Sequence, residues 1–252
     1  MRNWQITITH LADLILRLVP PFIVQWSRRY SIRPCQVLHK GVLLVMLLFL
    51  PACQQTQQGQ RAVYLLIDTS GTYTQELTKA QAIVHYLLAT LNSGDSIAVA
   101  RIDSGSFSEK DIIAQVTFDI RPSTANDQKR LFKHKLEQFV NTLKSGSRNT
   151  DITGGVIQAS DYVNETQAKE KYVLIFSDLE EDLPKSHIRN FQLDMQNIHV
   201  VALNVTKLRQ DNIDPRDYKK RLTDWQQRIE QGGGHWRVVN DLERLDRLIG
   251  FQ

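Results

Sequence analysis

The sequence predicts an α/β domain in which a doubly wound, mainly parallel sheet is flanked by helices. Three observations lead to this fold class. From residue 61 onward, short apolar runs alternate with longer amphipathic segments. Two of the runs, 62–67 and 172–176, are apolar throughout, as expected of strands that are covered on both faces. The alternation continues over residues 61–252, a length that fits one domain.

The expected strands follow from the apolar runs and from the turn residues that bound them. Their ranges are 63–67, 96–102, 112–118, 172–176, 198–203 and 236–239. The second and third are joined by a polar loop that contains Gly105, so we expect a hairpin at one edge of the sheet. Helical segments separate most of the other strands, which favours parallel pairing.

The expected helices carry apolar residues at helical spacing. Their ranges are 75–91, 127–143, 152–164, 215–231 and 241–249. In the first of them, Leu77, Ala80, Val84 and Leu87 recur at intervals of three and four residues, so one face can pack against the sheet. The glycines at 232–234 are expected to end the fourth helix.

Charge is distributed unevenly along the chain. The whole sequence holds 31 basic and 27 acidic residues, and residues 1–52 contain six of the basic residues but one acidic residue. The remaining 200 residues therefore hold 25 basic and 26 acidic side chains. Because this part has no basic excess, we expect no nucleic-acid partner.

The segment before the domain reads as a leader. Residues 41–50 form an apolar run after Lys40 that is short for a membrane span and matches the apolar region of a secretory signal. The tetrapeptide that follows, Leu50-Pro51-Ala52-Cys53, resembles the lipobox of bacterial lipoproteins. This resemblance implies lipidation of Cys53 and a chain anchored to a membrane of the bacterial cell envelope, on its extracytoplasmic side. Residues 53–60 then form a polar, flexible tether.

Residues 1–36 fit this interpretation poorly, because a signal rarely starts so far upstream of its apolar region. Two interpretations stay open. Translation starts near Val37 or Leu38, or the upstream residues form a genuine membrane-surface segment.

Cysteine usage limits the chemistry of the domain. The two cysteines, Cys35 and Cys53, both precede residue 61. The domain therefore contains no disulfide, no zinc–thiolate site and no cysteine nucleophile.

Polar side chains with oxygen donors follow three of the expected elements. Asp68, Ser70 and Thr72 come directly after the first strand, Thr150 lies in the polar loop before the third helix, and Asp178 follows the strand 172–176. The carboxyl ends of parallel strands share one edge of a sheet, where ligands bind. Hard oxygen donors at such an edge suit Mg²⁺. The alternative is a capping turn in which these side chains satisfy only loop backbone.

This set resembles the metal-ion-dependent adhesion site of von Willebrand factor type A domains. The family pattern is Asp-x-Ser-x-Ser, then a Thr before a helix, then an Asp after a central strand. Asp68-Thr69-Ser70-Gly71-Thr72 matches the first part, with Thr72 in place of the second Ser, and Thr150 and Asp178 match the rest.

The resemblance implies specific roles for these residues. Ser70 and Thr72 would bind Mg²⁺ or Mn²⁺ directly, while Asp68 and Asp178 would act largely through water. Thr150 would bind directly or through water. The cation would keep one open position for an acidic side chain of a protein partner. We interpret the nearby acids Asp151, Glu180, Glu181 and Asp182 as solvated loop charges.

Other families with a similar short motif fit less well. A haloacid-dehalogenase-type phosphatase needs a second Asp where Ser70 stands, and aspartic proteases have an all-β fold. Actin-like and sugar-kinase folds need two such domains and a longer chain.

We therefore predict a binding module for metal-dependent adhesion or complex assembly, and no enzymatic activity. The alternatives are a metal-free scaffold of the same fold and, less favoured, a metal-dependent hydrolase, for which no nucleophile and base accompany the carboxylates.

Overall fold

The computed structural model describes residues 60–71, 76–105, 108–143, 146–147, 149–183, 189 and 192–243. The predicted leader, the lipidation residue Cys53, Thr72 and most of the predicted last helix lie outside the described residues. The described residues belong to one compact unit, Gln57–Gln252. The two hydrophobic clusters found among the described residues lie in this unit, so we expect it to fold without the preceding residues. Within the described ranges, no helix has the length and apolar character needed to cross a membrane.

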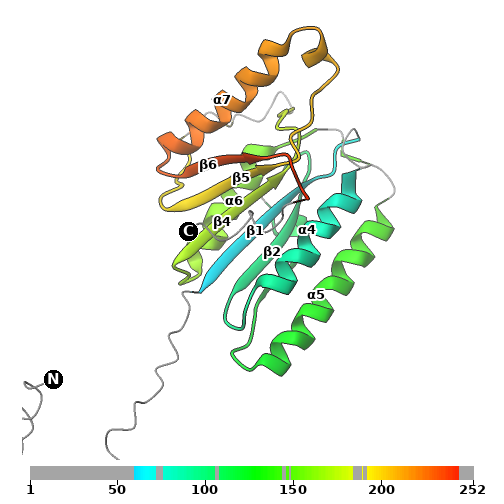
Figure 1. Ribbon diagram of the computed structural model, residues 1–252, viewed down its shortest axis with the longest axis vertical. Coiled ribbons are helices and arrows are strands. Elements are labelled where there is room, and N and C mark those ends of the chain that lie inside the picture. The colour runs from blue at the N-terminus through cyan, green and yellow to red at the C-terminus, as the bar shows by residue number, and fades with distance from the viewer. Residues whose placement is uncertain are drawn as a thin grey trace, which may run out of the picture. The chain divides into compact units, whose positions relative to one another are not determined.

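A single six-stranded sheet forms the centre of the domain (Figure 1). Its spatial order is β3-β2-β1-β4-β5-β6. The bounds are β1 Arg61–Asp68, β2 Ser96–Ile102, β3 Ile112–Thr117, β4 Glu170–Phe176, β5 Ile198–Leu203 and β6 His235–Val239. All neighbouring pairs are parallel except β2 and β3. The predicted fold class is confirmed, and so is the antiparallel hairpin at one edge.

Strand β1 lies near the middle of the sheet and is buried on both faces. Val63, Leu65 and Ile67 pack into one hydrophobic cluster. Tyr64 and Leu66 pack into a second cluster on the opposite face. This arrangement explains why the sequence of β1 is apolar without alternation, since a strand with two buried faces has no solvent side.

In the part of the chain that the structure describes, two helices cover each face of the sheet (Figure 1). Helices α4 (Leu77–Thr90) and α5 (Pro122–Thr142) contribute to the first cluster. Helices α6 (Ile152–Glu165) and α7 (Pro215–Gln231) contribute to the second. Two short 3₁₀ helices, η2 (Glu109–Asp111) and η3 (Gln210–Asn212), lie in loops. Helix α5 begins five residues before its predicted start, because Pro122 occupies the first helical turn, where its missing N–H costs nothing.

The turn after α7 requires glycine for reasons of space. A Cβ at Gly232 would lie 2.2 Å from the carbonyl oxygen of Leu193, and the carbonyl of Gly232 accepts a hydrogen bond of 2.9 Å from the N–H of Met195. The end of α7 therefore lies directly against the backbone that leads into β5. Gly233 follows with φ +84°, a conformation that glycine adopts at no steric cost.

Replacing Gly232 by alanine is expected to destabilise the domain by about 1–3 kcal/mol, because the neighbour that must move is backbone. Gly105→Ala is the matched control, since no atom lies within 4 Å of its added Cβ. Urea unfolding of residues 57–252 measures both variants. Equal urea midpoints for the two variants would show that the backbone around Gly232 has room for an added Cβ.

Candidate metal centre

Asp68 lies where β1 leaves the sheet, and its carboxylate is tied to the neighbouring strand. Residue Ile67 of β1 pairs with Phe176 of β4, so Asp68 and Ser177 leave the sheet together. The Ser177 hydroxyl donates to Oδ2 of Asp68 at 2.8 Å, and the Ser70 N–H donates to Oδ1 at 2.7 Å. Both Asp68 and Ser177 are buried. The carboxylate therefore has a fixed orientation.

Asp178 is positioned by a sharp turn after β4. Leu179 has φ 65°, a left-handed conformation that is uncommon for a residue with a side chain. Its N–H donates to the Ser177 hydroxyl at 3.0 Å, and its carbonyl accepts from the indole N–H of Trp225 at 3.1 Å. Oδ1 of Asp178 accepts from the N–H of Glu180 at 2.9 Å. The turn therefore holds a buried carboxylate next to the end of β1.

The two carboxylates occupy an electrostatically unfavourable environment. Burial raises the pKa of Asp178 to about 6, and the neighbouring carboxylate of Asp68 raises it as well, whereas the charge of Arg221 lowers it. Burial also raises the pKa of Asp68, against hydrogen bonds from Ser70 and Ser177 that lower it. Among the described side chains, neither carboxylate forms a salt bridge with a lysine or arginine. A cation at this edge would relieve the cost of burying two like charges.

The loop that carries Thr150 packs against the end of β1. The Ser147 N–H donates to the carbonyl of Thr69 at 2.9 Å, and the backbone of Ser147 forms an isolated parallel β-bridge with the backbone of Ser70. A Cβ at Gly146 would lie 2.5 Å from the backbone nitrogen of Gly71, so only glycine permits this approach.

Thr150 itself is held by the segment after β4. Its N–H and carbonyl both pair with the backbone of Asp182, at 2.8 and 3.0 Å. Thr150 is buried. The structure thus brings the loops of Ser70, Thr150 and Asp178 to one edge of the sheet. The placement of Thr72 lies outside what the structure describes.

Asp151 was expected to be a solvated loop charge, and that expectation is wrong. Its side chain is fully buried, and it caps the start of α6 by accepting from the N–H of Gly154 at 2.8 Å. It also forms a salt bridge of 2.8 Å with Arg189. The sequence contains the signal for this cap, because an Asp directly before a helix accepts from the third residue on.

Glu181 and Asp182 also have structural partners. Glu181 accepts from the N–H of Thr153 at 2.6 Å. Asp182 accepts from the side-chain amide of Asn149 at 3.2 Å. Sequence reasoning also left Ser177 out of the candidate set, although it contacts Asp68 directly. In the sequence, Ser177 is indicated by its position directly after a buried strand and next to Asp178.

No three His, Cys, Asp or Glu side chains among the described residues gather so that they could hold a metal ion by themselves. A cation at the edge formed by Asp68 and Asp178 would therefore need hydroxyl ligands as well. The hydroxyl of Ser70 is close enough to hydrogen-bond with Asp68. The donor set of two carboxylates and a neighbouring hydroxyl fits Mg²⁺, which prefers oxygen and keeps several waters.

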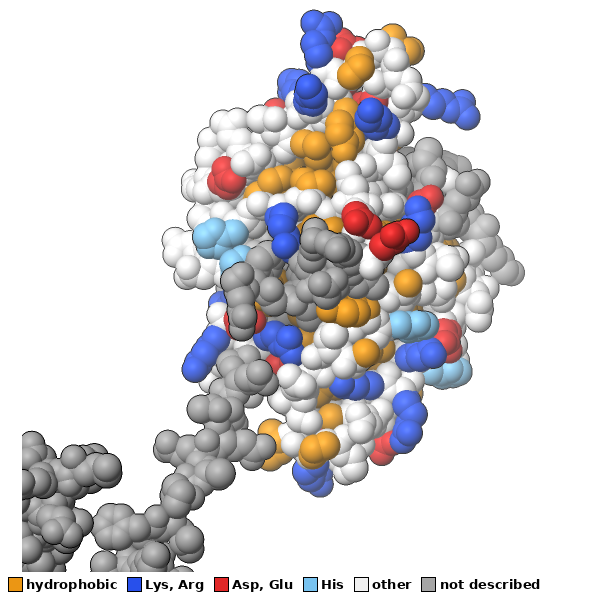
Figure 2. Space-filling model, in the orientation of Figure 1, with side chains coloured by type: hydrophobic (Ala, Val, Ile, Leu, Met, Phe, Trp, Pro, Cys, Tyr) orange, Lys and Arg blue, Asp and Glu red, His pale blue; other side chains and the backbone are white. Residues whose placement is uncertain are grey.

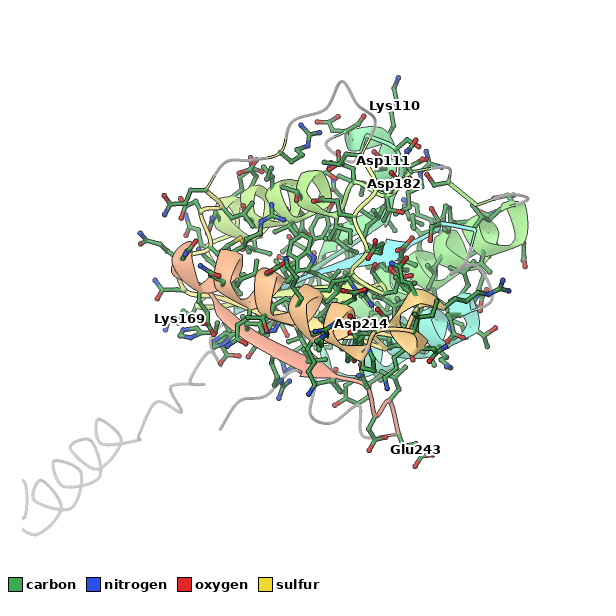
Figure 3. All side chains as sticks on the ribbon, turned by 90° about the horizontal axis from the view of Figure 1, so that it is seen from above. Lys110, Asp111, Lys169, Asp182, Asp214 and Glu243 are labelled. Carbon is green, nitrogen blue, oxygen red and sulfur yellow. The ribbon has the colours of Figure 1, made fainter. Side chains whose placement is uncertain are left out.

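A buried ion pair fastens the next loop to this edge. Arg221 of α7 donates from Nε to the carbonyl of Asp178 at 2.9 Å and forms a salt bridge of 2.8 Å with Asp211. The N–H of Leu208 donates to the same Asp211 carboxylate at 2.7 Å. Figure 3, turned to look from above, labels Asp182 in the segment after β4 and Asp214 at the start of α7. Arg221 thus connects the candidate centre to the loop after β5.

Asp211→Asn is expected to destabilise the domain by about 3 kcal/mol near neutral pH, because Arg221 would stay buried without its carboxylate. The hydrogen bond from Arg221 lowers the pKa of Asp211. A carboxyl group whose pKa is lower in the folded state than in the unfolded state stabilises the fold at every pH above its unfolded-state pKa. This contribution is lost as the pH falls through the folded-state pKa. Urea unfolding should therefore give a constant difference between parent and variant from about pH 8 to about pH 5.

The control for this prediction is Asp224→Asn, which removes an exposed ion pair with Lys220 and should cost less than about 1 kcal/mol. A difference between parent and Asp211→Asn that disappears by about pH 5 would contradict the lowered pKa.

Comparison with known proteins gives similarity at the level of fold. No protein-family model and no curated protein matches the chain. A solved von Willebrand factor type A structure from Catenulispora acidiphila is 15% identical, with a TM-score of 0.49 over 74% of this chain and 40% of that one. An aerotolerance-related membrane protein from Bacteroides fragilis is 13% identical, with a TM-score of 0.41 over 75% of this chain and 96% of that one. The PilB minor pilin from Streptococcus sanguinis is 12% identical, with a TM-score of 0.45 over 76% of this chain and 60% of that one.

The chain spans less than two thirds of the length of the first and third of these proteins. Since every TM-score is below 0.5, the fold assignment rests on the domain's own topology. That topology is a six-stranded sheet with one antiparallel edge strand and two helices on each face. It is an α/β, Rossmann-like fold consistent with the von Willebrand factor type A architecture.

Proposed function

We propose that this domain binds a protein partner through a divalent cation held at the carboxyl edge of its sheet. The cation is Mg²⁺ or Mn²⁺, and the partner offers an acidic side chain to it. The protein serves adhesion or complex assembly and is not an enzyme. It is anchored through a lipid on Cys53 and acts on the extracytoplasmic side of a bacterial envelope membrane.

One observation carries this proposal. Asp68 and Asp178 are buried carboxylates at the ends of neighbouring strands, and Ser177 fixes the first of them. The described residues give neither one a cationic side-chain partner in a salt bridge. Keeping two such carboxylates costs stability, and a bound cation offsets that cost.

The residues nearby would complete the centre. Ser70 lies two residues beyond Asp68 and would supply a direct hydroxyl ligand, as would Thr72. Thr150 would supply another oxygen from the opposite loop. Because hydroxyl ligands carry no charge, the cation would remain under-neutralised and attract an external carboxylate.

A metal-free scaffold is the second candidate. One observation favours it, because both oxygens of Asp68 already accept hydrogen bonds, from the Ser70 N–H and from the Ser177 hydroxyl. In that case the carboxylate acts as a capping group for the turn. Cation binding by the parent protein distinguishes the two candidates.

Asp68→Ala is expected to abolish binding of Mn²⁺ and Mg²⁺ to residues 57–252, because it removes one of the two buried carboxylates. Isothermal titration calorimetry after EDTA treatment measures this. Asp119→Ala is the control, since Asp119 pairs with Arg121 in an exposed loop. Parent protein that binds neither cation would leave the scaffold as the function. Cation-dependent hydrolysis of a phosphoester that disappears in Asp68→Ala would instead favour the hydrolase.

Ser177→Ala is expected to weaken cation binding by about 10–100-fold, because a group that orients a ligand contributes to affinity without touching the metal. Ser96→Ala is the matched control. Ser96 is a buried serine at the start of β2, at the amino ends of the parallel strands, and its hydroxyl hydrogen-bonds with the hydroxyl of Thr117. Both variants are titrated under the same conditions. Equal affinities would show that Ser177 does not position Asp68.

A further inference from the structure

The loop from Lys207 to Lys220, which leads through η3 into the start of α7, forms a projecting surface that the candidate centre does not use. We call residues 207–220 the α7 tip. Its side chains are mostly exposed, whereas β5 before it is buried. The tip follows the carboxyl end of β5, so it belongs to the same edge of the sheet as Asp68 and Asp178.

The α7 tip is rigidly fastened although its surface is exposed. Asp211 is buried within it and is held by Arg221 and by the N–H of Leu208, which donates at 2.7 Å. The N–H of Ile213 donates to the carbonyl of Gln210 at 2.9 Å. The tip therefore has a defined shape before any partner binds, which lowers the entropy cost of binding.

The same arginine connects the α7 tip with the candidate centre. Arg221 contacts the carbonyl of Asp178 at 2.9 Å and the carboxylate of Glu180 at 3.3 Å. The side chain of Gln210 also contacts Glu180, at 3.4 Å. Consider a partner protein whose acidic residue binds a cation beside Asp178. The partner's residues next to that acidic residue would contact the α7 tip.

The α7 tip presents one large apolar side chain within a basic surface. Ile213 is 88% exposed. Around it are five exposed basic residues, Lys207, Arg209, Arg216, Lys219 and Lys220, and two acidic residues that are not buried, Asp214 and Asp217. Arg216 forms a salt bridge with Asp214 and Lys220 one with Asp224, so Lys207, Arg209 and Lys219 are the three without a salt bridge to a described residue. Figure 2 shows basic side chains gathered at the end of the molecule where α7 begins. The remaining residues of 53–252 have no such excess, since they hold 20 basic and 23 acidic side chains once the tip is left out.

We propose that the α7 tip is a second contact surface for the protein partner, and that it binds an acidic segment carrying one large apolar side chain. This inference rests on the proposed function, because the acid that binds the cation brings the partner to this edge. Basic residues around a central apolar contact match the usual arrangement of a polar rim around an anchor. A membrane surface is the less suitable occupant, because a lipid-inserting surface presents several large apolar residues and the tip presents one.

The test uses residues 57–252 and two fluorescein-labelled probe peptides, Glu-Glu-Leu-Glu-Glu and Glu-Glu-Ser-Glu-Glu, with Mn²⁺ and with EDTA. With Mn²⁺, the leucine peptide should bind about tenfold more tightly than the serine peptide, because burial of a leucine side chain gives that difference. Ile213→Ser should remove this preference while leaving Mn²⁺ binding by calorimetry unchanged. Ile120→Ser is the matched control, since Ile120 is 77% exposed and precedes α5.

Charge reversal supplies an independent variant. Arg209→Glu together with Lys219→Glu should weaken binding of both peptides, whereas Lys135→Glu on the exposed face of α5 should not. If the parent binds Mn²⁺ but does not prefer the leucine peptide, or if Ile213→Ser keeps the preference, the inference is wrong. Binding to phosphatidylglycerol vesicles that depends on Ile213 and exceeds peptide binding would also overturn it, in favour of a lipid surface.

Failure of the proposed function has a different signature. Parent protein that binds neither Mg²⁺ nor Mn²⁺ contradicts the metal centre. A leucine preference that persists in EDTA and is lost in Ile213→Ser would still support the α7 tip as an interaction surface.

Discussion

Burial of β1 on both faces is the constraint on which the arrangement of this domain depends. Every residue of the strand after Arg61 is almost fully buried, up to and including Asp68. β1 and its neighbour β4 therefore bring polar side chains to the centre of the fold at the point where they leave the sheet. β1 ends at Asp68, and β4 is followed by Ser177 and Asp178 at the same level, because the two strands are parallel and in register. The candidate centre is a direct result of this register.

The fold was largely predictable from the sequence because its signals are local. The apolar run of β5 and the segment from Pro215 to the glycines at 232–234 gave β5 and α7 with the observed bounds, and the polar loop around Gly105 indicates the hairpin of β2 and β3. The start of α5 was misplaced because its first turn is polar and only Pro122 marks it. Local patterns thus locate elements well and locate their ends less well.

The candidate site was predictable in outline and not in its supporting contacts. Asp68 and Asp178 could be found because each follows a buried strand. The role of Ser177 depends on a hydrogen bond between residues 109 positions apart, which no local pattern contains. Asp151 was misinterpreted because its buried carboxylate is paired with Arg189, which lies 38 residues away in the sequence. Sequence shows which residues can act as ligands, whereas burial and long-range partners decide which of them act as structural groups.

The direction of β1 has a mechanical consequence. The strand begins at Arg61, just after the tether, and ends at Asp68 in the candidate centre. In a protein anchored at Cys53 and holding a partner at that centre, a pulling force would run along the axis of β1. It would act in shear on the hydrogen-bond ladders that β1 makes with β2 and β4, so that many bonds resist together. A force across the strands would instead break these bonds one after another. The topology therefore places the start of β1 and the candidate centre at opposite ends of one strand, the orientation in which a parallel sheet resists extension best.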